Sequence, residues 1–287
     1  MVTHIHQKAM LVKLKIGMWG AETIDPNVTR QVTEQHSAAG DAGRWHKKLL
    51  QSPHLDLYRS LVSQARRYHK DQTLPWDDNS TRIMPVMLFD DYVEGANVIF
   101  RAMTEAAGAL VDDYEDAIER EQKRQGTMFD VSDYPKANLV ASRFYHDLSF
   151  WPIPKSDDFR ITIDAEAEAE IKANVTNAVE ARIEEAMSGL WRRLYETITA
   201  LRDNLDQGSR LYDSYSENLI DLVDMLPAMN LTEDPHLAKL TGDLQLSLCA
   251  NNMDDFRDDN KLREQAVGKA NKALKAIEGF GAFQKAA

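Results

Sequence analysis

The sequence predicts a mainly α, elongated protein, built on an antiparallel hairpin of two long helices with a small two-stranded β ribbon and a C-terminal helical module. Two observations predict the hairpin. Apolar residues recur at alternating steps of four and three through residues 89–117, and a similar stripe runs through residues 164–207. A third observation predicts the ribbon, because apolar residues alternate with their neighbours through residues 10–19.

The first predicted element is the strand at residues 10–19. A lone strand needs a partner. The best candidate is the segment 159–163, where Phe159, Ile161 and Ile163 alternate with polar side chains. We therefore expect these two segments to pair into the β ribbon.

Two helices are predicted between the strand and the hairpin. Each begins with a capping residue followed by proline, which fits the first turn of a helix. Asp25-Pro26 predicts a helix that ends before residue 39, and Ser52-Pro53 opens a second helix that continues to about residue 72.

The two long helices carry the hairpin prediction. The apolar seam of the first runs from Phe89 to Ala117 and mixes alanine with aromatic residues. This mixture favours packing on another helix of the same chain over a simple two-stranded coiled coil. The seam of the second helix runs from Ile171 to Leu205. We therefore expect helices 89–117 and 164–207 to lie side by side.

The pattern of the chain changes after Gly208, and this sets the expected domain organisation. Residues 1–208 contain the strand, the basic helix and the long hairpin, and residues 209–287 form the C-terminal module. The helices predicted in that module are 213–229, 235–257 and 260–278.

Composition and charge exclude several classes of protein. The chain has 287 residues, is 43% hydrophobic and carries a formal net charge of −12. Its single cysteine excludes a disulfide framework and a cysteine-based zinc site. Its apolar runs are too short for a membrane span, and its first residues lack the pattern of a signal peptide. We therefore expect an acidic intracellular protein that makes no membrane contact.

The common catalytic and cofactor motifs are missing from the sequence. It holds no phosphate-binding glycine loop, no Gly-x-Ser-x-Gly and no His-Glu-x-x-His. Cys249 lies in an apolar helical pattern, which is typical of an inert buried thiol. The acidic group at residues 254–259 indicates a solvated helix face, with a metal-dependent hydrolase as the alternative. We predict no catalytic residue, no metal and no cofactor, and hence no enzyme.

The charge is divided unevenly along the chain. Residues 1–85 carry a balance of +4 and the remainder a balance of −16. Seven of the twelve lysines and arginines of residues 1–85 lie in residues 44–70, with aromatic side chains between them. Bases neutralise phosphates and aromatic rings stack on nucleobases, so this segment predicts contact with an anionic partner. The candidate residues are Arg44, Trp45, Lys47, Lys48, Arg59, Arg66, Arg67, Tyr68 and Lys70.

Several short motifs resemble those of a family of hypothetical proteins from tailed bacteriophages and prophages. They are residues 43–50 (GRWHKKLL), 68–76 (YHKDQTLPW), 133–135 (DYP) and 150–154 (FWPIP), and the likeness covers roughly residues 10–205. The resemblance implies a phage product in the cytoplasm of a host bacterium. It implies no activity and no functional residues.

These observations leave two functions of different classes. The first is a non-enzymatic phage protein that acts by oligomeric assembly, or as an adaptor in phage DNA metabolism or host takeover. Self-association would then join its oppositely charged parts. The second is a single-stranded nucleic-acid-binding protein that uses residues 44–70. A further alternative stays open, because the basic segment can pair with an acidic surface of its own chain or of a neighbouring copy.

Overall fold

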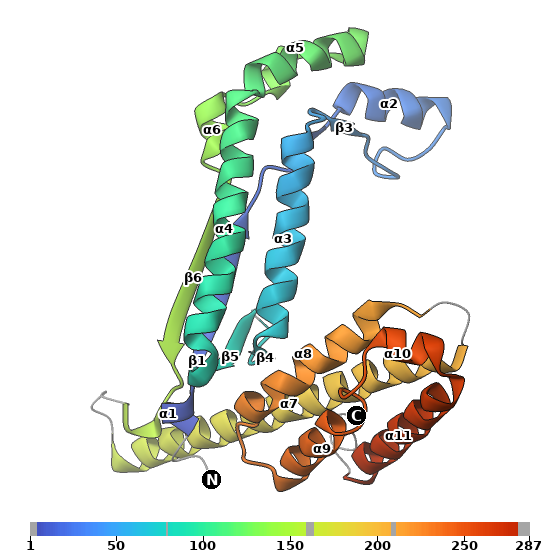
Figure 1. The fold of residues 1–287 in the computed structure, drawn as a ribbon. Coiled ribbons are helices and arrows are strands. Elements are labelled where there is room, and N and C mark those ends of the chain that lie inside the picture. The colour runs from blue at the N-terminus through green and yellow to red at the C-terminus, as the bar shows by residue number, and fades with distance from the viewer. Residues whose placement is uncertain (1–4, 79, 159–163, 208–210, 281–287) are drawn as a thin grey trace. The chain divides into compact units, whose positions relative to one another are not determined.

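The computed structural model describes residues 5–78, 80–158, 164–207 and 211–280 (Figure 1). The described chain forms two compact units. The first unit comprises the described parts of 1–13, 69–93 and 149–287, and the second comprises 14–68 and 94–148.

Helices dominate the described chain, which confirms the mainly α prediction. The helices are α1 (Ile5–Lys8), α2 (Pro26–Gln35), α3 (Pro53–Asp71), α4 (Phe89–Asp112), α5 (Tyr114–Gln125), α6 (Ala137–Ala141), α7 (Ala165–Gln207), α8 (Asp213–Met229), α9 (Pro235–Gln245), α10 (Met253–Asp258) and α11 (Asn260–Gly279). The strands are β1 (Ala9–Gly17), β2 (Glu22–Ile24), β3 (His46–Lys48), β4 (Leu74–Pro75), β5 (Thr81–Pro85) and β6 (Tyr145–Pro152). Short 3₁₀ turns lie at Val86–Leu88, Gly126–Met128, Val131–Asp133 and Ser156–Asp158.

The first unit is organised around α7. Helices α8 and α11 pack along it, α9 packs on α8, and α10 packs on α11 (Figure 1). Leu190 and Leu194 of α7 are fully buried in one core with Leu226 of α8 and Ile277 of α11. The helices of the expected C-terminal module therefore share their core with α7. Two helices, α9 and α10, replace the single helix predicted for 235–257.

The second unit is organised around α3 and the part of α4 that lies in it. Tyr58 and Val62 of α3 are buried in one cluster with Phe100 and Met103 of α4. A second cluster gathers near the start of α3 and the end of α4, where the ring of Trp19 meets that of Tyr114 edge-on at 5.7 Å between centroids. The apolar faces of α3 and of this part of α4 are therefore buried against each other inside this unit.

The predicted hairpin between residues 89–117 and 164–207 is not confirmed. Both helices exist, but α4 buries its seam on α3 within the second unit, and α7 buries its seam on α8 and α11 within the first. The physical reason is that an apolar stripe indicates that one face of a helix is buried, but it does not identify the element that packs against this face. The first helix is also shorter than predicted, since the chain turns at Asp113 between α4 and α5.

The strand predicted at residues 10–19 is confirmed as β1. Its predicted partner, 159–163, lies outside the described residues. The described neighbours of β1 are β5 and β6, in a four-stranded sheet of order β4-β5-β1-β6. β1 and β5 are antiparallel, with Ala9 opposite Pro85 and Lys13 opposite Thr81. The small sheet therefore has more strands than the expected ribbon, and β6 has no counterpart among the predicted elements.

Candidate interface around the basic segment

The structure divides the predicted basic residues into two groups. One lies in and just before β3, at residues 44–48, and the other lies along α3. Helix α3 begins at Pro53, so at a rise of 1.5 Å per residue Arg66 lies about 20 Å along the helix from that end. Lys70 also belongs to the first unit, whereas the other candidates belong to the second. The nine candidates therefore do not form one cluster.

The group on α3 presents three exposed bases, Arg66, Arg67 and Lys70. Arg59 is engaged locally, because its guanidinium pairs with Asp56 at 3.0 Å and donates a hydrogen bond to the carbonyl oxygen of Gly20 at 2.9 Å.

Tyr68 serves the core of the second unit. It is half-buried and packs on the cluster formed by α3 and α4. Its hydroxyl lies so close to Gly95 that a Cβ at that position would collide with it. The glycine therefore makes room for the tyrosine, and the ring is used in packing.

Lys47 is a structural residue in this fold. It is 6% exposed, its ammonium donates a hydrogen bond to the carbonyl oxygen of Met128 at 2.9 Å, and it forms an ion pair with Asp133. A buried ammonium needs such partners, because the desolvation of a charge is costly. Lys47 therefore fastens β3 to the segment that follows α5.

A second polar network fastens the chain just after β3. The buried carboxylate of Glu121 accepts a hydrogen bond from the backbone N–H of Gln51 at 2.8 Å and from the Nε of Arg124 at 2.6 Å. The hydroxyl of Tyr134 donates to the carbonyl oxygen of Leu49 at 2.7 Å. Side chains from α5 and the segment after it thus satisfy a backbone stretch that lies outside regular structure.

Helix α2 is built from local signals. The carboxylate of Asp25 accepts hydrogen bonds from the N–H groups of Asn27 and Val28, both at 3.0 Å, and Pro26 occupies the first turn. The hydroxyl of Thr29 accepts a hydrogen bond from the N–H of Trp45 at 2.9 Å, which ties the end of the following loop back to the helix. β2 and β3 pair beside it, with Thr23 opposite Lys47. We call α2, β2, the loop 36–45 and β3 the α2 platform.

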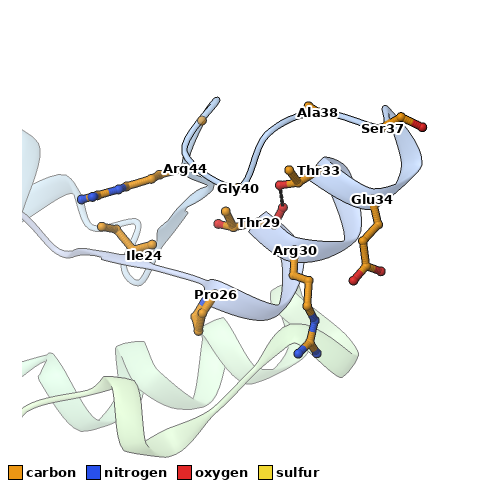
Figure 2. A pocket seen from close by; sticks show the side chains of 11 residues that line it. Ile24, Pro26, Thr29, Arg30, Thr33, Glu34, Ser37, Ala38, Gly40 and Arg44 are labelled. Atoms are coloured by element: carbon orange, nitrogen blue, oxygen red, sulfur yellow. Dashed lines mark hydrogen bonds between the residues drawn. The ribbon is translucent and has the colours of Figure 1, made fainter.

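The α2 platform contains a hollow of about 610 Å³ between the helix and its loop (Figure 2). Thr29 and Thr33 lie on the side of α2 that faces the loop, whereas Arg30 and Glu34 extend away from it (Figure 2). Arg44 and Ile24 form the opposite wall. A second, smaller hollow of about 280 Å³ shares Arg44 and is also lined by Trp45 and Val32.

Apolar side chains of the α2 platform remain open to solvent. Every residue of α2 is exposed or half-buried, and Val32, Ile24 and Trp45 are 43%, 40% and 46% exposed. Short isolated helices are marginal in water, and a helix in a folded protein normally buries an apolar face. The sequence pattern predicted the helix and marked Arg44 and Trp45. It could not show that no residue of the helix would be fully buried.

The first unit holds a cluster of buried polar groups that the sequence analysis did not find. Nδ1 of the buried His69 lies 2.7 Å from the hydroxyl of Tyr92, and its Nε2 finds no hydrogen-bond partner among the described residues. Burial, and secondarily the positive charge of Arg82, lowers the pKa of His69 to about 4. His69 is therefore neutral at pH 7.

Two arginines donate hydrogen bonds to backbone carbonyl groups at the C-terminal end of α3. Arg82 donates hydrogen bonds to the carbonyl oxygens of Thr73 at 2.8 Å and Lys70 at 3.3 Å. Arg193 donates to the carbonyl oxygen of Asp71 at 2.7 Å. The last carbonyl groups of a helix lack partners within it and carry partial negative charge. The two guanidinium groups supply those partners, which is a structural role.

The described residues offer little for metal binding or nucleophilic chemistry. Across the described ranges, no three His, Cys, Asp or Glu side chains gather closely enough to hold a metal ion. Burial, with a smaller effect of Asp224, raises the pKa of the Cys249 thiol to about 11, so it is protonated at pH 7 and a poor nucleophile. In the parts of the chain that the structure describes, no helix is both long and apolar enough to span a membrane.

Comparison of the chain with protein-family models, with curated proteins and with solved structures found no match.

Proposed function

We propose that this protein is a non-enzymatic bacteriophage protein that works in the host cytoplasm by oligomeric assembly, or as an adaptor in phage DNA metabolism or host takeover. The observation that carries the proposal is the α2 platform. Its helix has no fully buried residue among those the structure describes, and its hollows are framed by Trp45, Val32 and Arg44.

The physical chemistry of the α2 platform suits a protein partner. Tryptophan, tyrosine and arginine side chains are the groups that contribute most to protein interfaces, and solvent-exposed apolar groups release free energy when a partner covers them. Arg30 and Arg44 are balanced nearby by Glu34 and Asp41, so the platform is of mixed charge. We therefore expect a partner segment with apolar side chains and charged side chains of both signs.

Light scattering tests the assembly part of the proposal. The purified chain at micromolar concentration should form an oligomer of defined mass, and a monomer at every concentration would contradict assembly.

Capture from infected cells, followed by mass spectrometry, tests the adaptor part. The wild-type chain should retain a partner after nuclease treatment, and Trp45→Ala with Arg44→Glu should lose it. Arg66→Glu is the matched control, because it changes a base outside the platform. Equal capture by the platform variant and the wild type would contradict the role of the platform.

The second candidate function is single-stranded nucleic-acid binding. Trp45 favours it, because its ring is 46% exposed beside the exposed bases Arg44 and Lys48. Labelled single-stranded and double-stranded oligonucleotides should then bind at low salt, with an affinity that falls as the salt concentration rises. Trp45→Ala should weaken the binding of single strands most. No binding at low salt would exclude this function.

A further inference from the structure

The outward face of α11 carries a row of lysines. The helix buries its other face in the core of the first unit, through Ala266, Ala270, Ala273, Leu274 and Ile277. The residues opposite that face recur at steps of four and three and are all exposed: Lys261, Gln265, Gly268, Lys272 and Lys275. Lys269, which is also exposed, borders them. We call the four lysines the lysine row, and it spans about 21 Å at a rise of 1.5 Å per residue.

The described chain does not neutralise the lysine row. No ammonium group of the row lies within ion-pair distance of an acidic side chain in the described ranges, whereas other bases of this unit do. The segments outside those ranges contain no aspartate and no glutamate, so none of their side chains supplies a carboxylate. Residues three apart on a helix are neighbours, so Lys272 repels both Lys269 and Lys275. The free protein therefore holds a concentration of positive charge here.

The longest helix of the same unit treats its bases differently. On α7, Lys172 forms an ion pair with Glu168 one turn away, at 2.8 Å. On the same helix, Arg182 pairs with Glu185 at 3.1 Å. Such pairs of opposite charge are typical of a helix face that only meets solvent. The lysine row departs from this pattern.

Two acidic residues at the ends of α11 are engaged within the protein. Asp259 caps the helix by accepting hydrogen bonds from the N–H groups of Lys261 and Leu262, at 2.8 and 3.0 Å. Glu278 accepts one from the hydroxyl of Tyr195 at 2.9 Å. α11 holds five bases and two acids, a balance of +3, within residues 86–287, whose balance is −16. The row is therefore a local basic surface in the acidic part of the chain.

We propose that the lysine row binds the phosphate backbone of double-stranded DNA, independently of base sequence. Ammonium groups neutralise phosphates, and the exposed amides of Gln265 and Asn271 beside them are common donors to phosphate oxygens. The outward face has no aromatic ring between residues 261 and 275 that could stack on a base, so it gives no preference for single strands. The row belongs to the first unit and the α2 platform to the second, so this site goes beyond the proposed function.

The chemistry of the row suits DNA better than other anionic surfaces. A helix that lies on a membrane inserts apolar or aromatic side chains, and the exposed residues between 261 and 275 include none. The centre of a protein interface is poor in lysine and rich in aromatic residues and arginine, which are also missing from those exposed residues. The acidic remainder of the chain repels DNA, which confines the contact to the row.

Fluorescence anisotropy with a labelled DNA duplex of about 20 base pairs, roughly two helical turns, tests the proposal. The wild-type chain should bind at low salt, and the logarithm of its affinity should fall with the logarithm of the salt concentration with a slope of about −3 to −4. Lys269→Gln, Lys272→Gln and Lys275→Gln together remove three charges and keep side chains that favour a helix. This variant should bind roughly tenfold or more weakly, with a slope near −1.

Two control variants separate the row from the net charge of the chain. Arginine at the same three positions keeps the charge, and that variant should bind as the wild type does. Lys123→Gln, Lys136→Gln and Lys155→Gln remove the same charge from three exposed lysines on other parts of the chain, and should keep the slope. Equal weakening by this control would show that net charge governs binding, and would overturn the site. Circular dichroism confirms that each variant is folded.

Four other results would also overturn the site. They are no duplex binding at low salt, unchanged binding by the glutamine variant of the row, and binding that is lost in Trp45→Ala while the glutamine variant keeps it. The third result would move the contact to the basic segment of the second unit. The fourth is binding through the row to vesicles of phosphatidylcholine and phosphatidylserine, with none to DNA.

Light scattering and capture report on the proposed function separately. An intact oligomer or a captured partner without duplex binding overturns this inference and leaves the proposed function. A monomer that binds the duplex through the row contradicts assembly and supports this inference.

Discussion

Helices α2 and α9 begin in the same way and end in different environments. Each follows an aspartate that caps it and has proline in its first turn, and their lengths differ by one residue. α9 buries Leu237, Leu240 and Leu244 in the core of the first unit, whereas every residue of α2 is exposed or half-buried. The comparison teaches that capping sets where a helix begins, while burial depends on what the rest of the chain places against it.

The largest expected effect comes from shortening a buried side chain of α9. Leu237→Ala should lower the free energy of unfolding by roughly 3–5 kcal/mol, because Leu237 is 0% exposed and its loss leaves a cavity. Val32→Ala, the matched change in α2, should cost less than about 0.5 kcal/mol. Urea unfolding followed by circular dichroism measures both. Similar losses for the two variants would mean that α2 also has a covered face in solution.

The next effect concerns how the α2 platform is held without an apolar core of its own. Glu121→Ala should lower the stability of the second unit by about 2 kcal/mol, since it removes the buried carboxylate that accepts hydrogen bonds from the N–H of Gln51 and the Nε of Arg124. Glu121→Gln keeps an acceptor oxygen and should cost less. The two variants can be compared by the fluorescence of Trp19 and Trp45 during unfolding. A wild-type midpoint for Glu121→Ala would show that the network does not support the platform.

Protonation of His69 should make the stability of the first unit depend on pH. Its pKa of about 4 in the folded chain lies below the 6.5 of the unfolded chain, so the unfolded chain takes up the proton first as the pH falls. The contribution of neutral His69 is complete above pH 6.5 and is lost progressively towards pH 4. Between pH 7 and pH 5 the loss should be about 2 kcal/mol.

The matched variant for this prediction is His69→Gln, which keeps a hydrogen-bonding partner for Tyr92 and removes the titration. Its stability should therefore fall less than that of the wild type over the same pH range. Parallel curves for the two proteins would rule out His69 as the source.

The smallest expected effect comes from removing the aspartates that cap α2 and α9. Asp25→Ala and Asp234→Ala each remove a helix cap, which should cost about 1 kcal/mol. Because α9 is part of a core, Asp234→Ala should lower the stability of the whole first unit. Because α2 has no fully buried residue, Asp25→Ala should speed hydrogen exchange only in α2 and its loop. A global loss of stability from Asp25→Ala would contradict that view.

Local features of the fold were predictable from particular residues. Asp25-Pro26 and Ser52-Pro53 mark the starts of α2 and α3, the alternation at residues 10–19 predicts β1, and the stripe after residue 164 predicts α7. These signals lie within a few residues of the structure they specify. The helix cap, the first-turn proline and the side-chain period all act over one or two turns.

The candidate site was predictable only in part. Arg44, Trp45 and the exposed bases of α3 were marked by composition, but Lys47 has the same chemistry in sequence and is buried against Met128 and Asp133. No sequence pattern distinguishes a lysine that meets solvent from one that meets a carbonyl group 81 residues away. The hollows beside α2 and the environment of His69 depend on such distant contacts too.

The sequence by itself determined several helix starts, the main periodicities, the strand β1 and the uneven distribution of charge. The tertiary structure decided that α4 packs on α3, that α7 packs on α8 and α11, and that α2 has no fully buried residue. The physical reason is the range of each interaction. Capping and periodicity are set by neighbours in sequence, whereas the choice of a packing partner depends on shape and area brought together from distant segments.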